Sequence, residues 1–379
     1  MRPFLVTAAL CVLATASSAL TPVDVGDPPR TYGHFLNAGE AALCRAGAAT
    51  GGLESFFRNP ACVADVRAVS GQATARVVTT SRDHLGEGAE GLSAEDGAFL
   101  LSQVAAVKRS GSWVFGFGYT APSSRSLRLT GTVGEASGRE LYDGTFEGGL
   151  RYFEMVFGTR IGRDGRGSIG FASGLVNLTE SVREAVGQTL ETAEVTGSAT
   201  SMAAGITYEA TDRVTLGAGY RWGTRIGVRG DWYDDVGRTG SSHTQPTIVA
   251  GLTVRATKDI ALHGCYLNEG WGAATATLSA YEENDGRRDE FDGSVASVAL
   301  GAEAALMGGK LTLRAGGATR VAPDAADGGM PQWAAGIGGS YRFSGYALDG
   351  AVVRERHEVD GMGGTISNYG LYLTVSYDL

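Results

Sequence analysis

The C-terminal stretch reads Tyr369-Gly-Leu-Tyr-Leu-Thr-Val-Ser-Tyr-Asp-Leu379, and large apolar residues occupy every second position in it. Successive side chains of a β-strand point to opposite faces, so these residues share one face. They are Tyr369, Leu371, Leu373, Val375, Tyr377 and Leu379. The opposite face is mostly small or polar, with Gly370, Thr374, Ser376 and Asp378 beside Tyr372. The stretch therefore predicts a strand in a wall that separates an apolar medium from a polar one.

The same alternation recurs along the chain in segments of about ten to fifteen residues, a length that spans a bilayer as a tilted strand. An even number of such segments, about fourteen, is typical of an outer-membrane barrel. The predicted strands are 72–80, 98–108, 111–120, 148–162, 165–178, 197–209, 212–226, 243–257, 259–272, 291–304, 309–320, 331–343, 345–356 and 366–379.

Connections between these segments alternate between long and short. The long ones are 81–97, 121–147, 179–196, 227–242, 273–290, 321–330 and 357–365. A soluble sandwich gives no reason for loop length to follow strand parity, whereas an outer-membrane barrel has short periplasmic turns and longer external loops. We therefore predict an all-β protein, a closed antiparallel transmembrane β-barrel of about 14 strands over residues 66–379.

Composition agrees with this class of protein. The 58 Gly lack the three-residue period of collagen, and a hydrophobic content of 43% excludes disorder. A mean hydropathy of −0.04 is compatible with a barrel, because only every second strand residue meets lipid. The formal net charge of −9 disfavours nucleic acid as a partner, since phosphate binding needs a basic surface.

The first nineteen residues have the features of an export signal. One Arg precedes an apolar run from Phe4 to Ala16, and Ser17-Ser18-Ala19 forms a small-residue cleavage site. The run is shorter than the roughly 20 residues of a spanning helix. We therefore predict a signal peptide over residues 1–19.

Residues 20–65 lack the two-residue period and carry two helix-start signals instead. Asn37 is followed by Glu40 three residues later, as in a capping box, and Asn59 is followed by Pro60 at the first helical position. A wall of about fourteen strands encloses more space than its own side chains fill. We therefore predict that residues 20–65 form a helical hatch that plugs the barrel.

The cysteines allow one disulfide at most in the exported chain, because Cys11 leaves with the signal. Cys44 and Cys62 both lie in the predicted hatch and are the possible pair, although spacing alone does not establish the geometry.

Basic residues in the predicted strands fall mostly on the face opposite the apolar one. A Lys or Arg facing lipid at mid-membrane costs about 2–4 kcal/mol, so we expect these side chains to face the lumen. They are Arg213, Arg221, Arg255, Arg314 and Arg342.

Nothing in the sequence indicates an enzyme. The five His are scattered, with no two at a metal-ligand spacing on one element, and no phosphate-binding loop occurs. We expect neither a metal nor a cofactor.

Two passages resemble the FadL-type transporters of long-chain fatty acids and other hydrophobic compounds. One is Ala41-Ala-Leu-Cys-Arg-Ala-Gly-Ala-Ala-Thr50 followed by the hatch motif Phe56-Phe57-Arg-Asn59-Pro60-Ala61. The other is the pair of hairpins that begin at Gly205 and Gly251. The same opening occurs in the PorV/PorQ-like barrels associated with protein secretion, and the motif does not separate the two.

The resemblance implies a fourteen-stranded channel for passive uptake of hydrophobic small molecules such as fatty acids, gated by the hatch. The alternative is a PorV/PorQ-like barrel that serves secretion or surface architecture without transport. Expected partners are outer-membrane lipids, lipopolysaccharide and a hydrophobic ligand, with the protein a monomer. A continuous apolar channel would favour transport, and a lumen lined throughout by Arg, Glu and Ser would favour the alternative.

Overall fold

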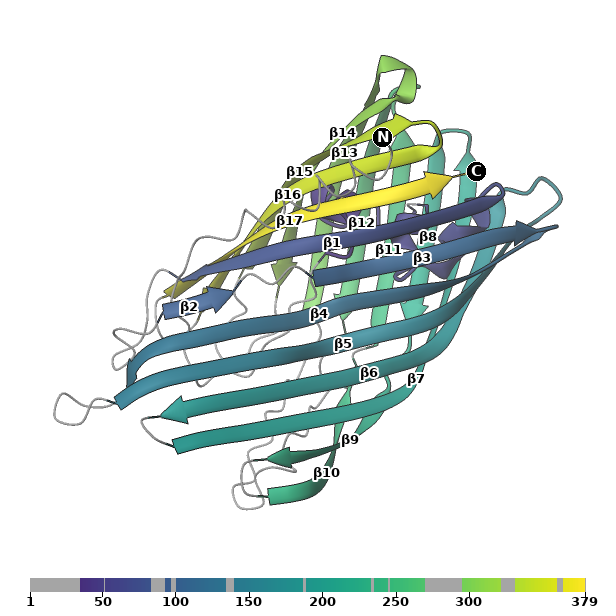
Figure 1. Ribbon diagram of the computed structural model, residues 1–379. Helices are drawn as coiled ribbons and strands as arrows, with labels where there is room; N and C mark the ends of the chain where they lie inside the picture. Colours follow the sequence, from purple (N-terminus) through teal and green to yellow (C-terminus); the bar gives the residue numbers. More distant parts are fainter. Residues whose placement is uncertain are drawn as a thin grey trace.

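The computed structural model describes most of the chain after the predicted signal. The described residues are 35–50, 52–82, 93–96, 100–133, 140–186, 189–232, 235–244, 246–269, 295–321, 331–359 and 364–378. The predicted signal peptide, the first part of the predicted hatch and several predicted loops lie outside these ranges. Figure 1 shows a single large barrel of tilted strands with the short N-terminal helices inside it.

The wall consists of long antiparallel strands in chain order, which the alternating sequence predicts. They are β1 (Val69–Arg82), β2 (Ser93–Asp96), β3 (Leu100–Ser110), β4 (Trp113–Val133), β5 (Glu140–Ile161), β6 (Gly167–Val186), β7 (Thr189–Thr211), β8 (Val214–Arg221), β9 (Arg225–Trp232), β10 (Asp235–His243), β11 (Thr247–Arg255), β12 (Ile260–Glu269), β13 (Val295–Leu306), β14 (Leu311–Val321), β15 (Pro331–Phe343), β16 (Tyr346–Val359) and β17 (Gly364–Asp378). The helices are α2 (Ala38–Ala42), η1 (Leu53–Ser55), η2 (Pro60–Asp65) and η5 (Met307–Gly309).

In three cases two of these segments are pieces of the same wall strand. β8 and β9 form one interrupted strand, because both pair with β7. β10 and β11 form another, because β10 pairs with β9 and β11 pairs with β8. The short β2 pairs with β4 beyond the end of β3. Counted in this way, the described residues form fourteen wall strands, and the pairing of β1 with β17 closes the barrel. The predicted fold class is confirmed.

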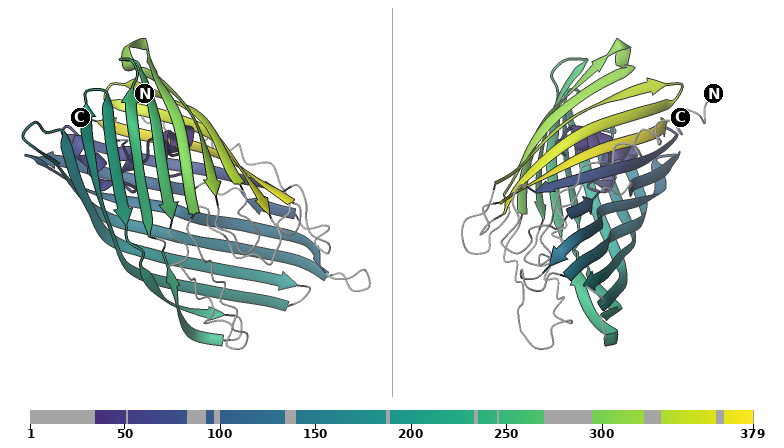
Figure 2. Two further views of the ribbon diagram at one scale, coloured as in Figure 1. Left: turned by 180° about the vertical axis from the view of Figure 1, so that it is seen from behind. Right: turned by 60° about the vertical axis from the view of Figure 1, so that its left-hand side comes forward.

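Short turns join the strands at one end of the barrel, which we call the turn end, and both β1 and β17 also reach it (Figure 2). One of the two-residue turns is Ser344-Gly345, where both residues have positive φ, 48° and 80°. A two-residue hairpin turn needs such values, and Gly adopts them at low cost. The opposite end, the loop end, holds the longer connections.

Three predicted loops are largely strand, which corrects the expected loop lengths. β4 and β5 extend over most of 121–147, β6 and β7 over most of 179–196, and β9 and β10 over most of 227–242. The wall is therefore taller on the side of β4 to β10 than on the side of β12 to β17 (Figure 1). The extensions of β5 and β6 pair in register with strands on both sides, so their backbone N–H and C=O groups are satisfied within the sheet.

The outer surface carries a broad belt of exposed apolar side chains. Its members include Phe115, Phe117, Phe153, Met155, Phe171, Leu175, Ile206, Leu216, Leu252, Leu262, Leu300, Leu313, Ile337 and Val352. Exposed aromatic residues flank the belt at the turn end (Trp113, Tyr208, Tyr341, Phe343 and Tyr346) and at its other margin (Tyr220, Trp222, Tyr266, Trp333 and Tyr369). An apolar band between two aromatic girdles is the outer surface of a membrane barrel.

The helices of the described residues are all short. None of them is long and apolar enough to cross a membrane.

Candidate functional site

The described N-terminal residues 35–50 and 52–65 lie inside the barrel, and we call them the hatch. Nearly all of them are buried, with Gly52 and Asp65 as the exposed exceptions. The helix α2 packs against β15 and β16, and η2 packs against β5, β6 and β7, so the hatch spans the lumen from one wall to the other (Figure 2). The hatch thus blocks a straight path through the lumen near the turn end.

Asn37 begins α2 and also joins it to the wall. Its Oδ1 accepts a hydrogen bond from the Glu40 N–H at 2.8 Å, which is the capping interaction that the sequence predicts. Its Nδ2 donates to the Glu54 carbonyl at 2.8 Å and to Gln103 Oε1 of β3 at 3.0 Å. One amide therefore caps the helix, links two parts of the hatch and ties both to β3.

Asn59 repeats this arrangement at the start of η2. Its Oδ1 accepts from the Ala61 N–H at 3.1 Å, with Pro60 at the first helical position as predicted. Its Nδ2 donates to the Ala49 carbonyl at 2.7 Å and to the Ile206 carbonyl of β7 at 3.0 Å. The side chain is fully buried, so water does not compete for these groups.

The hatch backbone approaches the wall where the strands carry Gly. A Cβ at Gly170 would lie 2.3 Å from Ala61 N, and a Cβ at Gly336 would lie 2.1 Å from Ala41 O. Phe56 of the hatch motif uses the same kind of space, since its ring fills the position of a Cβ at Gly118. Gly in the wall therefore makes room for the hatch.

Two charged clusters hold the hatch in place. Within it, Glu40 forms ion pairs with Arg58 and Arg45 and accepts from the Leu36 N–H at 2.8 Å. Between hatch and wall, Arg314 of β14 lies 3.8 Å from the Glu54 carboxylate and donates to Glu303 at 2.8 Å and Asp349 at 3.0 Å. Burial raises the pKa of the Glu54 carboxyl, and Arg314 opposes that shift.

An apolar cluster extends from the hatch along the inner face of the taller wall. Phe56 and Phe57 of the hatch contribute to it at one end, and Leu178, Val195 and Val228 of the wall contribute at the other. Between them lie Tyr152, Val176, Ala203, Ile226 and the partly buried Leu150 and Ala199. The ring of Phe57 meets that of Tyr152 edge to face, with 5.0 Å between centroids.

Sheet register orders this cluster into rows across the wall. Leu150, Leu178, Gly197 and Val228 are partners on β5, β6, β7 and β9 in turn. The opposite face at the same level carries Arg151, Asn177, Ser198 and Gly227. At this height the inner face is apolar and the outer face is polar, whereas nearer the turn end the outer face is the apolar one.

One ion pair lies beside this apolar cluster. The Arg221 guanidinium of β8 donates to both carboxylate oxygens of Glu154 on β5, and Ser201 Oγ donates to the same carboxylate at 2.6 Å. The guanidinium lies over the Phe57 ring, 3.8 Å from its centroid, and donates to the Phe57 carbonyl at 2.7 Å. This pair therefore joins three wall strands to the hatch beneath the apolar rows.

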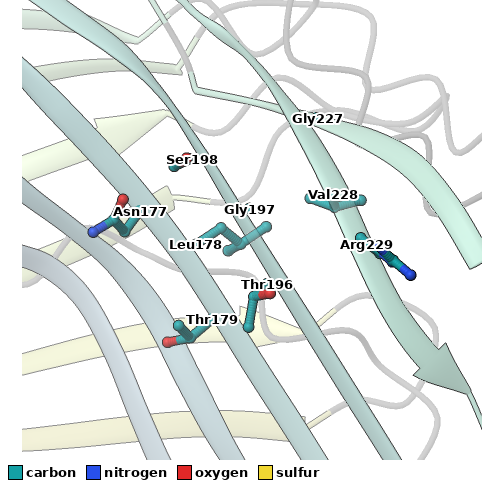
Figure 3. Close-up of a pocket in the computed structure, with 9 residues that line it drawn as sticks. All are labelled: Asn177, Leu178, Thr179, Thr196, Gly197, Ser198, Gly227, Val228 and Arg229. Atoms are coloured by element: carbon teal, nitrogen blue, oxygen red, sulfur yellow. The ribbon is translucent and has the colours of Figure 1, made fainter. Parts of the chain in front are cut away.

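An open hollow of about 620 Å³ lies against β6, β7 and β9 at the end of the cluster (Figure 3). Its lining residues are Asn177, Leu178, Thr179, Thr196, Gly197, Ser198, Gly227, Val228 and Arg229. Leu178, Gly197 and Val228 of this lining belong to the inner face, and the other six residues belong to the outer face.

The predicted lumen-facing arginines fall into two groups. Arg221 is buried and Arg314 is half-buried, and both take part in the ion pairs described above. Arg213, Arg255 and Arg342 are exposed where strands meet the turn end. Among the described residues, no group of three or more His, Cys, Asp or Glu side chains could hold a metal ion.

The possible Cys44–Cys62 disulfide is not formed, because the two thiols belong to different parts of the hatch and contact different groups. Cys44 Sγ lies 3.4 Å from the Gly316 carbonyl of β14, and Cys62 Sγ lies 3.7 Å from the Ala49 carbonyl. Both are buried free thiols, as is Cys265.

No family model and no curated protein matches this sequence. Solved structures do match it. A Pseudomonas aeruginosa FadL homologue aligns with 96% of this chain and 99% of its own, at a TM-score of 0.68 and 15% identity. The chain has the fold of the FadL-type barrels.

Two further solved structures share this FadL-type fold. The Pseudomonas putida toluene transporter TodX has a TM-score of 0.64 and 16% identity, over 90% of this chain and 99% of its own. The Ralstonia pickettii toluene transporter TbuX has a TM-score of 0.62 and 14% identity, over 91% and 100%. The resemblance that the hatch motif indicated at the sequence level therefore extends to the whole barrel.

Proposed function

We propose that this protein is an outer-membrane channel through which hydrophobic small molecules enter passively, with the hatch as its gate. The observation that carries the proposal is the apolar inner face of β5, β6, β7 and β9, which continues without a break to Phe56 and Phe57 of the hatch. A water-filled porin has a polar interior instead.

Along these strands the apolar side chains change from the outer face near the turn end to the inner face farther up, and this change supports the same function. The polar outer face at Arg151, Asn177 and Ser198 suits a wall that projects beyond the lipid, while the apolar inner face offers a dry surface to a ligand. Other proteins with this fold are named as toluene transporters. A compound that binds in the lumen between the loop end and the hatch would leave toward the cell interior only after the hatch shifts.

Uptake through the reconstituted barrel tests the proposal. Val195→Arg places a charge in the apolar cluster, and Thr192→Arg places the same charge on the opposite, exposed face of β7. We expect Val195→Arg to lower uptake of a radiolabelled hydrophobic compound about tenfold or more, because a desolvated charge disrupts the apolar surface. Thr192→Arg should retain uptake.

Heat-modifiable migration on gels shows whether each variant forms the barrel. Equal uptake by the wild type, the folded Val195→Arg variant and empty vesicles would contradict the channel function. That result would favour the secretion-associated alternative.

A further inference from the structure

Among the described residues, Arg221 is the only cation that contacts the rings of the apolar cluster, and Glu154 neutralises it. Arg221 and Glu154 have side chains that are 6% and 1% exposed, so water does not screen their interaction. The guanidinium lies 3.8 Å from the ring centroid of Phe57 and 5.0 Å from that of Tyr152. Any ligand that reaches the hatch along the apolar rows would meet this pair at the base of its site.

Both terminal nitrogens of Arg221 already donate hydrogen bonds to groups of the protein. One terminal nitrogen donates to Glu154 Oε1 and to Ser201 Oγ, the latter at 2.8 Å, and the other donates to Glu154 Oε2 at 3.0 Å and to the Phe57 carbonyl. A fork-to-fork pair of this kind satisfies both charges in a fixed geometry. A carboxylate ligand would have to displace Glu154 to bind Arg221.

Of the remaining described arginines on β5, β6 and β9, Arg160 lies at the turn end, where it pairs with Asp65. The others are exposed, and each occupies the strand face opposite to the apolar rows. They are Arg151, Arg183, Arg225 and Arg229. An organic acid in the cluster would therefore lose its hydration without gaining a free cation among the described residues, and it would stand beside the negative charge of Glu154. Both effects oppose binding of an acid.

We propose that Glu154 determines the charge selectivity of the lumen: by neutralising Arg221 it makes this site accept neutral hydrophobic compounds and reject organic acids, fatty acids included. This inference rests on the proposed function, and it narrows the class of compound that the channel takes. The site selects an uncharged aromatic or aliphatic molecule, for which Phe57, Tyr152 and Leu178 provide the contacts.

Removal of the Glu154 charge should invert this preference. In Glu154→Gln the amide oxygen still accepts from Arg221 and the side-chain volume is kept, but the guanidinium charge becomes unbalanced. A carboxylate ligand can then supply the missing negative charge beside Arg221, while a neutral ligand gains nothing from the change.

A matched pair of probes measures the selectivity directly. Phenylacetate has a carboxylate where ethylbenzene has a methyl group, and the two compounds are otherwise alike. Each can be tested for displacement of the neutral fluorophore N-phenyl-1-naphthylamine from purified protein held in amphipol. In the wild type we expect phenylacetate to bind about tenfold or more weakly than ethylbenzene. In Glu154→Gln we expect phenylacetate to gain about tenfold or more, with ethylbenzene changed less than about threefold.

Two further variants separate charge from structure. Glu303→Gln neutralises a carboxylate that accepts from Arg314, remote from the apolar cluster, and should leave the ratio of the two affinities unchanged. Glu154→Gln/Arg221→Gln removes both charges, so the preference for ethylbenzene should return. Where Glu154→Gln alone does not fold, the wild type still tests the proposal, because phenylacetate must bind it about tenfold or more weakly than ethylbenzene.

The outcomes distinguish this inference from the proposed function. If neither probe displaces the fluorophore from any folded variant, the proposed function fails. If ethylbenzene and phenylacetate bind the wild type equally well, or the folded Glu154→Gln variant keeps the wild-type ratio, the selectivity role of Glu154 is wrong while the channel function stands.

Discussion

Among single residues, Asn59 makes the contacts between hatch and wall that are easiest to remove selectively. Asn59→Ala leaves the Ala61 N–H and the Ala49 and Ile206 carbonyls without their side-chain partner. Each buried group left unpaired costs about 1–3 kcal/mol. We expect a looser hatch in an intact barrel, seen as more frequent spontaneous openings in planar bilayers.

Asn59→Asp separates the two roles of this residue. The carboxylate retains the acceptor that caps η2 but lacks the two donors, so its opening frequency should fall between those of the wild type and Asn59→Ala. An Asn59→Ala variant that stays closed as long as the wild type would contradict the role of Asn59 in fixing the hatch.

Gly170 shows how small the space between hatch and wall is. A Cβ there would meet Ala61 N and the Pro60 backbone at 2.3 Å. Backbone cannot rotate away, so Gly170→Ala should destabilise the docked hatch by about 1–3 kcal/mol, as overpacking does. Gly227→Ala is the control, because a Cβ there has no neighbour within 4 Å. Proteolytic cleavage of the hatch should accelerate in the first variant alone.

The thiols of the hatch provide a chemical test of its burial. Burial raises the pKa of the Cys44 thiol to about 12 and also raises that of Cys62, and the thiolate is the reactive form. We expect no maleimide labelling of the folded protein at neutral pH. Without reductant, the unfolded chain from residue 20 onward should take up label at Cys44, Cys62 and Cys265. Labelling of Cys265 alone would indicate a disulfide between the other two.

At the scale of the strand, β6 crosses from an apolar to a polar environment on one face. Phe171 is 41% exposed within the outer apolar belt, and Thr179 lies on the same face eight residues farther toward the loop end. Phe171→Arg should reduce the stability of the membrane-inserted barrel by about 2–4 kcal/mol, and Thr179→Arg by about 0–1 kcal/mol. Urea unfolding in lipid vesicles measures both, and equal effects would place the membrane boundary elsewhere.

Strand positions were predictable from the sequence, and strand lengths were not. Alternation locates every wall strand because lipid and lumen impose opposite requirements on successive residues. That requirement ends where β6 and β7 leave the membrane. Residues 179–196 therefore look like a loop, although β6 pairs with β7 as far as Val186 and Thr189.

The sequence predicted only those parts of the candidate site that depend on residues close together in the chain. Asn37 and Asn59 are helix caps, which a few neighbouring residues reveal, and both form the expected caps. Glu154 was missed because its partner Arg221 is 67 residues away, and their contact depends on the barrel closing around the hatch. The available signal was that Glu154 is the one acidic residue of the segment 148–162 and lies on its inner face.

The whole molecule combines a wall that is taller on one side with a hatch near its turn end. The apolar cluster and the ion pair of Arg221 join the taller wall to the hatch, and Arg314 joins the hatch to the opposite wall. A ligand bound at the cluster would therefore touch the hatch itself. We propose that displacement of the hatch opens the path through the barrel.

Ion conductance in planar bilayers tests this account most directly, by comparing the wild type with a variant that lacks residues 20–65. The wild type should conduct poorly because the hatch fills its lumen. The deletion variant, shown by heat-modifiable migration to form the barrel, should conduct as an open pore, since a wall of about fourteen strands leaves a water-filled channel. Conductance as low as that of the wild type in the folded deletion variant would contradict the account.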